Sequence, residues 1–296
     1  MSPQDESGGR WFVALQYLLP QHLLSRLVGR VTRSRVGWLR RALIGAFMRG
    51  FTPDMSDAAQ PDPQGYPSFN AFFTRALRPG ARASSAEPRA IDSPVDGRIS
   101  AMGTSAQGRL IQAKGREYSL RALLAGHDTL ADSLDGGLFM TIYLAPFNYH
   151  RIHMAAAGTL TGAWYVPGRL FSVNDATARH VPGLFARNER LVLRFDADEG
   201  PHLLVMVGAL FVGSMGTVWH GDIAPRRARG SVALPVPAAA SLPRGAELGR
   251  FNMGSTVILL LPPGAARWDP SLAAGSVLRV GQPIGARIGA ARAGSA

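Results

Sequence analysis

The distribution of apolar and polar residues divides the chain into two parts with different periodicities. Up to about residue 65, apolar residues recur at helical spacing with arginines on a neighbouring face. The repeating positions are Leu23, Leu27 and Val31, then Leu39, Leu43 and Phe47. A further short helix is predicted over residues 68–78, where three phenylalanines fall on one side. The first part of the chain is therefore expected to be helical and amphipathic.

After Pro79 the pattern changes to short apolar runs of strand length. These runs are rich in Val, Leu, Ile and Phe and are bounded by Gly, Pro and Asn, which predicts β-strands. They span residues 138–145, 190–195, 202–212 and 256–261. Helical periodicity is weak here except at residues 120–124, residues 224–244 resemble a loop, and residues 289–296 a frayed end. The pattern predicts an α+β fold, with a helical region at 1–65 and a mainly β domain at 66–296.

Composition narrows the chemistry that the chain can carry. The chain of 296 residues contains no cysteine, which excludes disulfides, thiolate nucleophiles and cysteine-ligated zinc. A pyridoxal-phosphate enzyme needs a lysine for its Schiff base, and Lys114 is the single lysine. The formal net charge of +12 favours an anionic partner such as nucleic acid, lipid headgroups or a phosphorylated substrate.

Much of the positive charge lies near the N-terminus. Between Ser7 and Pro53 there are eight arginines and no acidic residue, and Trp11, Phe12, Tyr17 and Trp38 are interleaved with them. Such a segment is typical of a helix lying on a membrane surface, although helices packed on the rest of the protein would give the same pattern. No apolar stretch is long enough to span a bilayer, and no signal-peptide pattern is present. No nucleic-acid-binding motif accompanies the charge.

The tripeptide Gly254-Ser255-Thr256 stands directly before an apolar run. A serine that follows glycine can turn its hydroxyl on the preceding carbonyl, because glycine has no side chain to obstruct it. The β-branched threonine and the strand after it would hold the serine rigidly. The tripeptide therefore indicates a self-cleavage site, and the alternative is a turn that leads into a buried strand.

Three more polar residues could serve that serine. Asp96 stands in a Pro-Val-Asp-Gly turn, and His150 and His153 follow a predicted strand. Asp96, His153 and Ser255 would form a proton relay, as in serine hydrolases, although the nucleophile elbow of many hydrolases is missing. A metal site at the two histidines is the competing interpretation, with a third ligand from Asp175, His180 or His220.

Taken in order, these segments and several others resemble the bacterial phosphatidylserine decarboxylase proenzymes of the pyruvoyl-dependent type I. The shared motifs run from about Trp11 to Gly285. They are residues 94–97 (PVDG), 112–115 (QAKG), 118–120 (YSL), 149–154 (YHRIHM), 165–168 (YVPG), 170–174 (LFSVN), 184–190 (LFARNER), 218–219 (VW) and 254–256 (GST). Two positions differ from the usual family pattern, Met253 in place of Leu and Ala155 in place of Pro, and neither change removes a reactive group.

The resemblance implies that the chain is a zymogen. In this family the serine attacks the glycine carbonyl, and elimination and hydrolysis then leave an N-terminal pyruvoyl group. Here the products would be a β chain of residues 1–254 and an α chain of residues 255–296. Gly254 and Ser255 would be the cleavage site, and Asp96, His153 and Ser255 would form the charge relay.

The resemblance also implies the reaction of the mature enzyme. The pyruvoyl group made from Ser255 would form a Schiff base with phosphatidylserine and accept the electrons left when carbon dioxide departs, giving phosphatidylethanolamine. His150 would be the proton donor, and Phe171, Ser172 and Val173 would contact the substrate. Neither a metal nor pyridoxal phosphate would be needed.

Partners and location are also implied by the resemblance. The enzyme would bind phosphatidylserine and an anionic membrane surface, peripherally, on the cytoplasmic side of the cell membrane. The α and β chains of one precursor would remain associated, a homodimer is expected, and nucleic acid is not expected as a partner.

Overall fold

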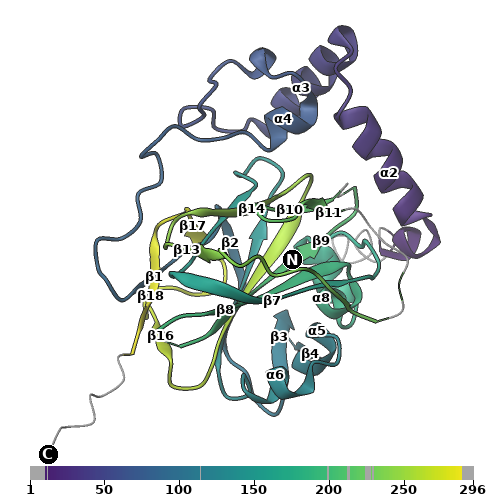
Figure 1. The fold of residues 1–296 in the computed structure, drawn as a ribbon. Coiled ribbons are helices and arrows are strands. Elements are labelled where there is room, and N and C mark those ends of the chain that lie inside the picture. The colour runs from purple at the N-terminus through teal and green to yellow at the C-terminus, as the bar shows by residue number, and fades with distance from the viewer. Residues whose placement is uncertain are drawn as a thin grey trace, which may run out of the picture.

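The computed structural model describes residues 11, 13–113, 115–198, 200–211, 214–223, 228 and 230–288. Lys114, part of the predicted 224–244 loop and the predicted frayed end at 289–296 lie outside these residues. Helices dominate the first 75 positions and strands dominate the rest, which confirms the predicted α+β class. Figure 1 shows the N-terminal helices gathered on one side of the β-sheets.

The helices are short after the N-terminal region. Residues 13–18 are helical. The others are α2 (Gln21–Thr32), α3 (Gly37–Phe51), the 3₁₀ turn η1 (Pro63–Gly65), α4 (Phe69–Phe73), α5 (Leu120–Leu123), α6 (Asp128–Asp132), α7 (Asp175–His180) and α8 (Leu184–Arg187).

The strands are spread over the rest of the chain. They are β1 (Ala90–Asp92), β2 (Gly97–Thr104), β3 (Arg109–Ala113), β4 (Arg116–Ser119), β5 (Leu138–Leu144), β6 (Arg151–His153), β7 (Gly158–Val166), β8 (Arg190–Asp196) and β9 (His202–Gly208). The later ones are β10 (Met215–Thr217), β11 (Gly221–Ile223), β12 (Val232–Ala233), β13 (Ser241–Leu242), β14 (Glu247–Phe251), β15 (Ser255–Leu261), β16 (Ala266–Trp268), β17 (Val277–Leu278) and β18 (Pro283–Arg287).

Most strands join one large antiparallel sheet. Its order is β12-β7-β8-β9-β15-β5-β2-β17, and β13 also pairs with β7. A four-stranded sheet of order β11-β10-β14-β6 carries both the segment before the predicted cleavage site and the second histidine. The four strands predicted at 138–145, 190–195, 202–212 and 256–261 correspond to β5, β8, β9 and β15. Within the predicted 224–244 loop, β12 and β13 form two short strands that the sequence pattern did not indicate.

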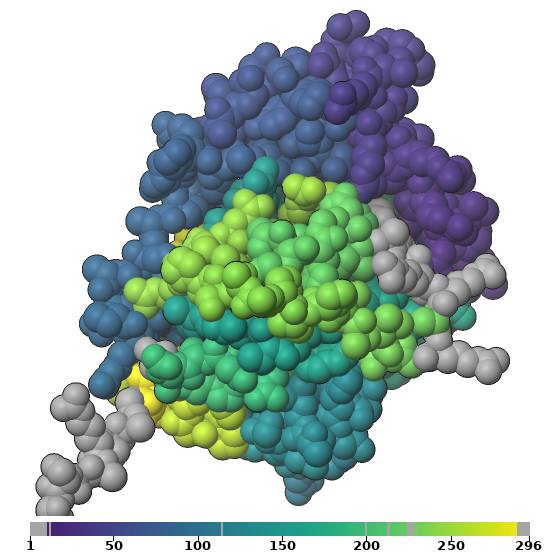
Figure 2. Space-filling model, viewed as in Figure 1, coloured from purple at the N-terminus to yellow at the C-terminus, as the bar shows by residue number. Residues whose placement is uncertain are grey.

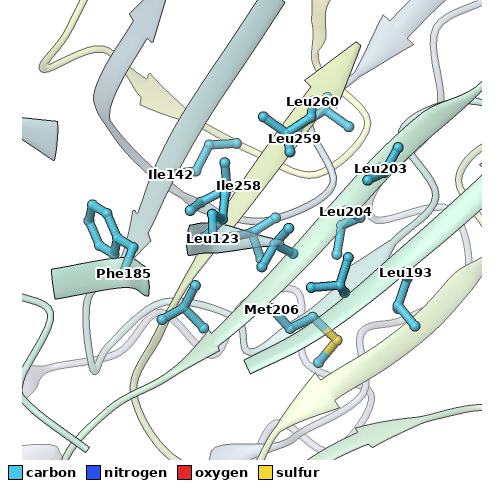
Figure 3. Packing of buried hydrophobic residues seen from close by; sticks show 14 of the residues in the cluster. Leu123, Ile142, Phe185, Leu193, Leu203, Leu204, Met206, Ile258, Leu259 and Leu260 are labelled. Atoms are coloured by element: carbon cyan, nitrogen blue, oxygen red, sulfur yellow. The ribbon is translucent and has the colours of Figure 1, made fainter. Parts of the chain in front are cut away.

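The large sheet is buried on both faces at its centre. Every residue of β9 and β15 is buried, so these strands are continuous apolar runs without alternation. Figure 3 shows side chains of β5, β8, β9 and β15 packed together with Leu123 of α5 and Phe185 of α8. A second, smaller and mainly aromatic cluster is made of side chains of α3 and α4 together with Tyr66, and Met253 contacts both clusters.

Helix α4 begins with a side-chain cap. Ser68 Oγ accepts a hydrogen bond from the Ala71 amide at 3.1 Å, which satisfies one of the free donors of the first turn. Phe72 and Phe73 are buried against the Phe47 ring of α3, at centroid distances of 5.8 and 5.9 Å. The helix predicted at 68–78 is therefore confirmed in its first half and ends at Phe73.

The amphipathic helix α2 has its polar face toward the protein. Its buried residues are Gln21, Ser25, Gly29 and Thr32, whereas Leu23, Leu27 and Val31 are 43–49% exposed. The polar contacts are specific: Gln21 accepts from the Leu170 amide at 2.9 Å, and Ser25 accepts from the Phe211 amide at 3.2 Å. The apolar stripe predicted from the sequence exists, but it faces outward.

A buried histidine makes the fold sensitive to acid. His202 on β9 is 2% exposed and stacks on Phe195, and burial lowers its pKa from the ordinary 6.5 to about 3. The unfolded chain therefore binds a proton as the pH falls below 6.5, while the folded chain does not until about pH 3. Stability conferred by a neutral His202 is present above pH 6.5 and is lost as the pH falls toward 3.

We expect His202→Gln to reduce this acid sensitivity. Between pH 7 and pH 5, the variant should lose about 2 kcal/mol less unfolding free energy than the unsubstituted chain. Denaturant unfolding at the two pH values measures the difference, and His127→Gln removes an imidazole outside the core as a control. An equal pH dependence in the His202 variant and the unsubstituted chain would contradict the assignment.

Candidate active site

Ser255 is the first residue of β15 and lies in the centre of the large sheet. It pairs with Leu144 of β5 on one side and Gly208 of β9 on the other. The residue has no exposed surface, and its Oγ has no hydrogen-bond partner among the described residues. A buried hydroxyl that bonds to nothing costs free energy, and the hydroxyl of Thr256 shares this property, so it is the glycine before Ser255 that sets this serine apart.

The three residues before Ser255 form a tightly held connection from β14. The Asn252 amide donates to Ser214 O at 3.1 Å, and its side-chain Nδ2 donates to Ser214 Oγ at 2.6 Å. Asn70 of α4 donates from Nδ2 to Asn252 Oδ1 at 3.1 Å. A Cβ built on Gly254 would meet no atom within 4 Å, so space is open beside the bond that precedes Ser255. The segment predicted to be cut is anchored at one end and unobstructed at the other.

His150 lies on the turn that leaves β5, next to the same connection. Its carbonyl accepts from the Phe251 amide at 3.0 Å, and its ring lies 4.1 Å from the Phe73 ring. Nδ1 is 2.9 Å from Asn148 O, and because a carbonyl can only accept, Nδ1 carries the proton. Nε2 is buried without a partner, and burial lowers the pKa of His150 to about 3. In the uncleaved chain His150 is a neutral base with a bare Nε2.

The Asp96 carboxylate is bound by an arginine. Arg82 donates from Nε to Oδ1 at 3.2 Å and from Nη2 to Oδ2 at 2.8 Å, and the Val280 amide donates to Oδ1 at 2.8 Å. Arg82 also donates from Nη1 to Asp57 at 2.5 Å. This paired geometry fixes the plane of the carboxylate.

His153 is hydrogen-bonded at both ring nitrogens. Nδ1 donates to Gly245 O at 2.7 Å, so Nε2 accepts from the Tyr149 hydroxyl at 3.0 Å. Burial raises the pKa of Tyr149, which keeps that hydroxyl protonated, and burial lowers the pKa of His153. The lone pair that a base would use is thus occupied by a tyrosine.

The predicted relay residues fall into two neighbouring groups. Asp96 and His153 lie close together, since the His153 amide donates to Pro94 O at 2.8 Å and the Asp96 charge opposes the fall in the His153 pKa. Ser255 and His150 flank the β14–β15 connection. The described hydrogen bonds include none that joins Asp96, His153 and Ser255 to one another, so the relay stays a prediction.

The segment predicted to contact substrate lies one strand away from Ser255. Leu170 lies 3.5 Å from the place where a Cβ of Gly208 would be, and Gly208 pairs with Ser255. Phe171 and Val173 are buried in the main core, and the Ser172 amide donates to Gln16 Oε1 at 2.7 Å. Their predicted role in substrate binding therefore remains a prediction.

The alternative metal site finds no support in the described part of the chain. No group of three or more His, Asp or Glu side chains there is arranged to hold a metal ion. His220, one of the candidate third ligands, has its ring nitrogens 2.7 Å from Thr217 Oγ1 and 2.7 Å from Pro235 O.

Three residues that the sequence pattern did not single out belong to this site. Arg82 holds Asp96, Tyr149 holds His153, and Arg75 is a buried arginine that lowers the pKa of His150 further. Of these three, only Arg75 and Tyr149 could have been noticed in the sequence. Arg75 follows the three phenylalanines of residues 69–73, and Tyr149 directly precedes His150.

The site thus combines a buried nucleophile that follows a glycine with an imidazole beside it. Because Ser255 has no exposed surface in the uncut chain, the arrangement suits attack on the chain itself.

Comparison with known proteins agrees with a site arranged for attack on the chain itself. The family model described as phosphatidylserine decarboxylase matches residues 69–286, and a second model, described as PSD, matches residues 11–52. Relatives named phosphatidylserine decarboxylase proenzyme include those of Methylococcus capsulatus, 48% identical, and Ectopseudomonas mendocina, 50% identical. The two alignments each cover 93% of this chain, and 96% and 98% of the respective relatives. The chain belongs to the phosphatidylserine decarboxylase family.

We expect Tyr149→Phe to accelerate self-cleavage. For His153 to accept the serine proton, its Nε2 must first give up the hydrogen bond from Tyr149, which is worth about 1 kcal/mol. Removal of the hydroxyl should therefore raise the cleavage rate about fivefold. Gel analysis of a cell-free translation time course measures the rate. A slower reaction would show instead that the tyrosine takes part in proton transfer.

Proposed function

We propose that this chain is the proenzyme of a phosphatidylserine decarboxylase, which cleaves itself between Gly254 and Ser255 and then converts phosphatidylserine to phosphatidylethanolamine. The observation that carries the proposal is the buried, unbonded hydroxyl of Ser255 directly after Gly254, in a chain that belongs to this family. The products are a β chain ending at Gly254 and an α chain beginning at position 255.

Self-cleavage requires only groups of the chain and one water molecule. Ser255 Oγ attacks the Gly254 carbonyl carbon, its proton passes to His153 Nε2, and the amide becomes an ester. Loss of the Ser255 α-proton then expels the Gly254 carboxylate and leaves dehydroalanine. Water adds to that residue and ammonia departs, so the α chain begins with a ketone. Asp96, held by Arg82, would act on His153 through its charge.

The described residues fit a pyruvoyl group at this position. The hydroxyl of Ser255 is buried and has no hydrogen-bond partner among the described residues. A ketone at this position has no hydroxyl, so this unpaired donor would be removed. This group supplies an electrophilic carbonyl that binds the substrate amine and accepts electrons on loss of carbon dioxide. The same chemistry would otherwise call for pyridoxal phosphate, and neither that cofactor nor a metal is part of the proposal.

His150 is the proposed proton donor to the substrate carbon. Its Nε2 is free of other partners, and its ring is held in place by Phe73 and by the Asn148 carbonyl. Since burial keeps Nε2 unprotonated in the uncleaved chain, the ring has to gain a proton once substrate is present. An incoming anion would favour that step by offsetting nearby positive charge.

A serine hydrolase that uses Asp96, His153 and Ser255 is less well supported. A hydrolase must present its serine to substrate, whereas Ser255 has no exposed surface. Its aspartate should orient the histidine directly, whereas Asp96 accepts from Arg82 and Val280. A lipid- or nucleic-acid-binding protein without activity would leave the unbonded serine unexplained.

The proposal includes peripheral contact with an anionic membrane through the N-terminal helices. No helix among the described residues is long and apolar enough to cross a bilayer. Within the part of the chain that the structure describes, ten of the seventeen exposed large apolar side chains fall within residues 11–51, although this stretch is a small part of the chain. Figure 2 shows these helices, in purple, along one margin of the molecule. Their arginines would attract the lipid headgroups.

An apolar groove lies between the same helices and the cleavage site. It has a volume of about 480 Å³ and is lined by Leu27, Val31, Leu43, Phe47, Phe69 and Met253. Because Met253 is two residues from Ser255, the groove leads from the outward apolar stripe of α2 toward the reaction centre. We assign it to the acyl chains of the substrate. A homodimer and a location on the cytoplasmic side of the cell membrane remain predictions from the family resemblance.

Two substitutions separate cleavage from decarboxylation. Ser255→Ala should remain one full-length chain without activity, because both the nucleophile and the source of the ketone are lost. His150→Ala should still cleave but should lose most of its phosphatidylserine decarboxylation, by at least about 100-fold. Intact-mass measurement reports cleavage and carbon dioxide release reports turnover. A fully active His150→Ala enzyme would refute the assignment of the proton donor.

Membrane binding should depend on the outward-facing apolar residues. We expect the double variant Leu23→Gln/Trp38→Gln to bind phosphatidylserine-containing vesicles at least about tenfold more weakly, since two exposed apolar side chains no longer enter the lipid. Vesicle flotation measures the partition. Val277→Gln, which changes a 72% exposed valine on β17, is the matched control. Equal binding of both variants would exclude these helices as the membrane contact.

A further inference from the structure

Arg75 is a buried arginine without a close ion pair among the described residues: Asp96 and Asp54 act on its charge from beyond 4 Å, and its Cζ lies 5.9 Å from the centroid of the Phe72 ring. It follows α4, is 3% exposed, and makes one side-chain hydrogen bond, from Nη2 to Phe147 O at 3.2 Å. Its Nε and Nη1 are buried without partners, and within the described residues no carboxylate lies within 4 Å of it. Burying a guanidinium without a close ion pair is unfavourable, and an anion bound beside it would offset that cost.

Two other arginines show how this fold satisfies a guanidinium away from solvent. Arg190, 2% exposed, donates from Nε, Nη1 and Nη2 to four backbone carbonyls at 2.6–2.9 Å. Arg82 is paired with the carboxylates of Asp57 and Asp96. This fold can therefore satisfy a buried guanidinium with carbonyls or carboxylates. Arg75 differs, because two of its nitrogens have no such partner.

That place adjoins both the reaction centre and the apolar groove. Phe69, at the start of α4, lines the groove, and Phe73, at its end, contacts the His150 ring. The chain continues from Phe73 directly to Arg75, and the arginine's charge opposes protonation of His150. One short segment thus carries a surface for lipid chains, a contact to the proton donor and an unpaired cation.

We propose that Arg75 binds the phosphodiester of the lipid substrate, an inference that rests on the proposed function. A phosphodiester has two oxygens that match the fork of N–H donors on a guanidinium, and here Nε and Nη1 are the free pair. The phosphodiester also lies between the acyl chains and the amine of the substrate, and Arg75 follows the helix whose Phe69 lines the groove and whose Phe73 contacts His150.

The carboxylate of the substrate is the other anion that could bind Arg75. An arginine bound to that group would stabilise the carboxylate in the ground state and lose the interaction as carbon dioxide forms, which would slow the reaction. The phosphodiester keeps its charge throughout, so binding it stabilises substrate and transition state alike. Reaction chemistry therefore favours the phosphodiester.

Access to Arg75 would follow from self-cleavage. Asn70 on α4 is hydrogen-bonded to Asn252, and Met253 packs against the α3–α4 aromatic cluster. Cutting the bond after Gly254 releases the end of this segment, so α4 is no longer fixed to a continuous chain. The cover over Arg75 is then free to shift when substrate binds.

The experiment compares Arg75→Gln and Arg75→Lys with Arg78→Gln. Arg78 is the matched control, because its side chain is 61% exposed and is bonded to Asp57. Self-cleavage is checked first by intact mass. Two competitive inhibitors of decarboxylation are then compared: dihexanoylphosphatidylethanolamine, which has the phosphodiester, and O-hexyl-L-serine, which has the carboxylate without a phosphate.

In Arg75→Gln, we expect about 50-fold weaker inhibition by the phosphatidylethanolamine and a matching rise in KM for dihexanoylphosphatidylserine. Inhibition by O-hexyl-L-serine should change less than about twofold, and Arg75→Lys should recover part of the loss because it keeps the charge but not the fork. Weaker inhibition by O-hexyl-L-serine alone would assign Arg75 to the carboxylate and overturn the proposal. Unchanged inhibition by both compounds would also overturn it, as would failure of both Arg75 variants to cleave.

Failure of the proposed function gives a different result. In that case the unsubstituted chain and Arg78→Gln would themselves remain uncleaved or fail to release carbon dioxide from phosphatidylserine.

Discussion

The pairing of β15 with β5 and β9 is the constraint on which the site depends. It places Ser255 between Leu144 and Gly208, fixes its backbone on both sides and removes it from solvent. Strand β15 lies on the α-chain side of the proposed cleavage point, whereas its partners β5 and β9 lie on the β-chain side. Strands β17 and β18 add further pairs, to β2 and β1. A cut before Ser255 therefore breaks one covalent bond and leaves the hydrogen bonds that hold the two products together.

Several of the buried polar atoms without a hydrogen-bond partner belong to the reactive groups of the site, although others lie elsewhere in the described part of the chain. Ser255 Oγ, His150 Nε2 and two nitrogens of Arg75 all lack partners, whereas the buried Arg190 and Asp96 are fully bonded. A stable core would not retain such groups without compensation. At the site, the cost of leaving these atoms unbonded is consistent with keeping a nucleophile, a base and a cation available for reaction.

The sequence predicts the parts of this protein that depend on local periodicity. The central strands are visible as unbroken apolar runs because both faces of β9 and β15 are buried. Short strands such as β12 and β13 are not visible, since two residues carry no period. Helical spacing also revealed the apolar stripe of α2, but spacing alone does not say which face a helix turns to the protein.

Contacts between distant segments explain what the sequence could not show at the site. The residue types Asp96, His150, His153 and Ser255 were recognisable from their motifs. The partners that hold two of them were not, because Arg82 reaches Asp96 from a separate segment, and the carbonyl of Gly245 meets His153 from 92 residues away. A short motif is enough to identify the reactive side chains in the sequence, whereas the orientation of those side chains depends on contacts with distant segments.

The outward apolar face of α2 has a consequence for how the N-terminal region is attached. An ordinary surface helix is held by burial of its apolar side, an interaction that is strong and depends little on the direction of individual contacts. This helix is held by directional contacts through Gln21 and Ser25, which tolerate little displacement. The polar face of α2 therefore attaches the helix to the protein, and its apolar face is left for other contacts. A lipid surface can bind the apolar face without displacing the helix from the protein. Away from lipid, the same face makes copies of the protein prone to associate with one another.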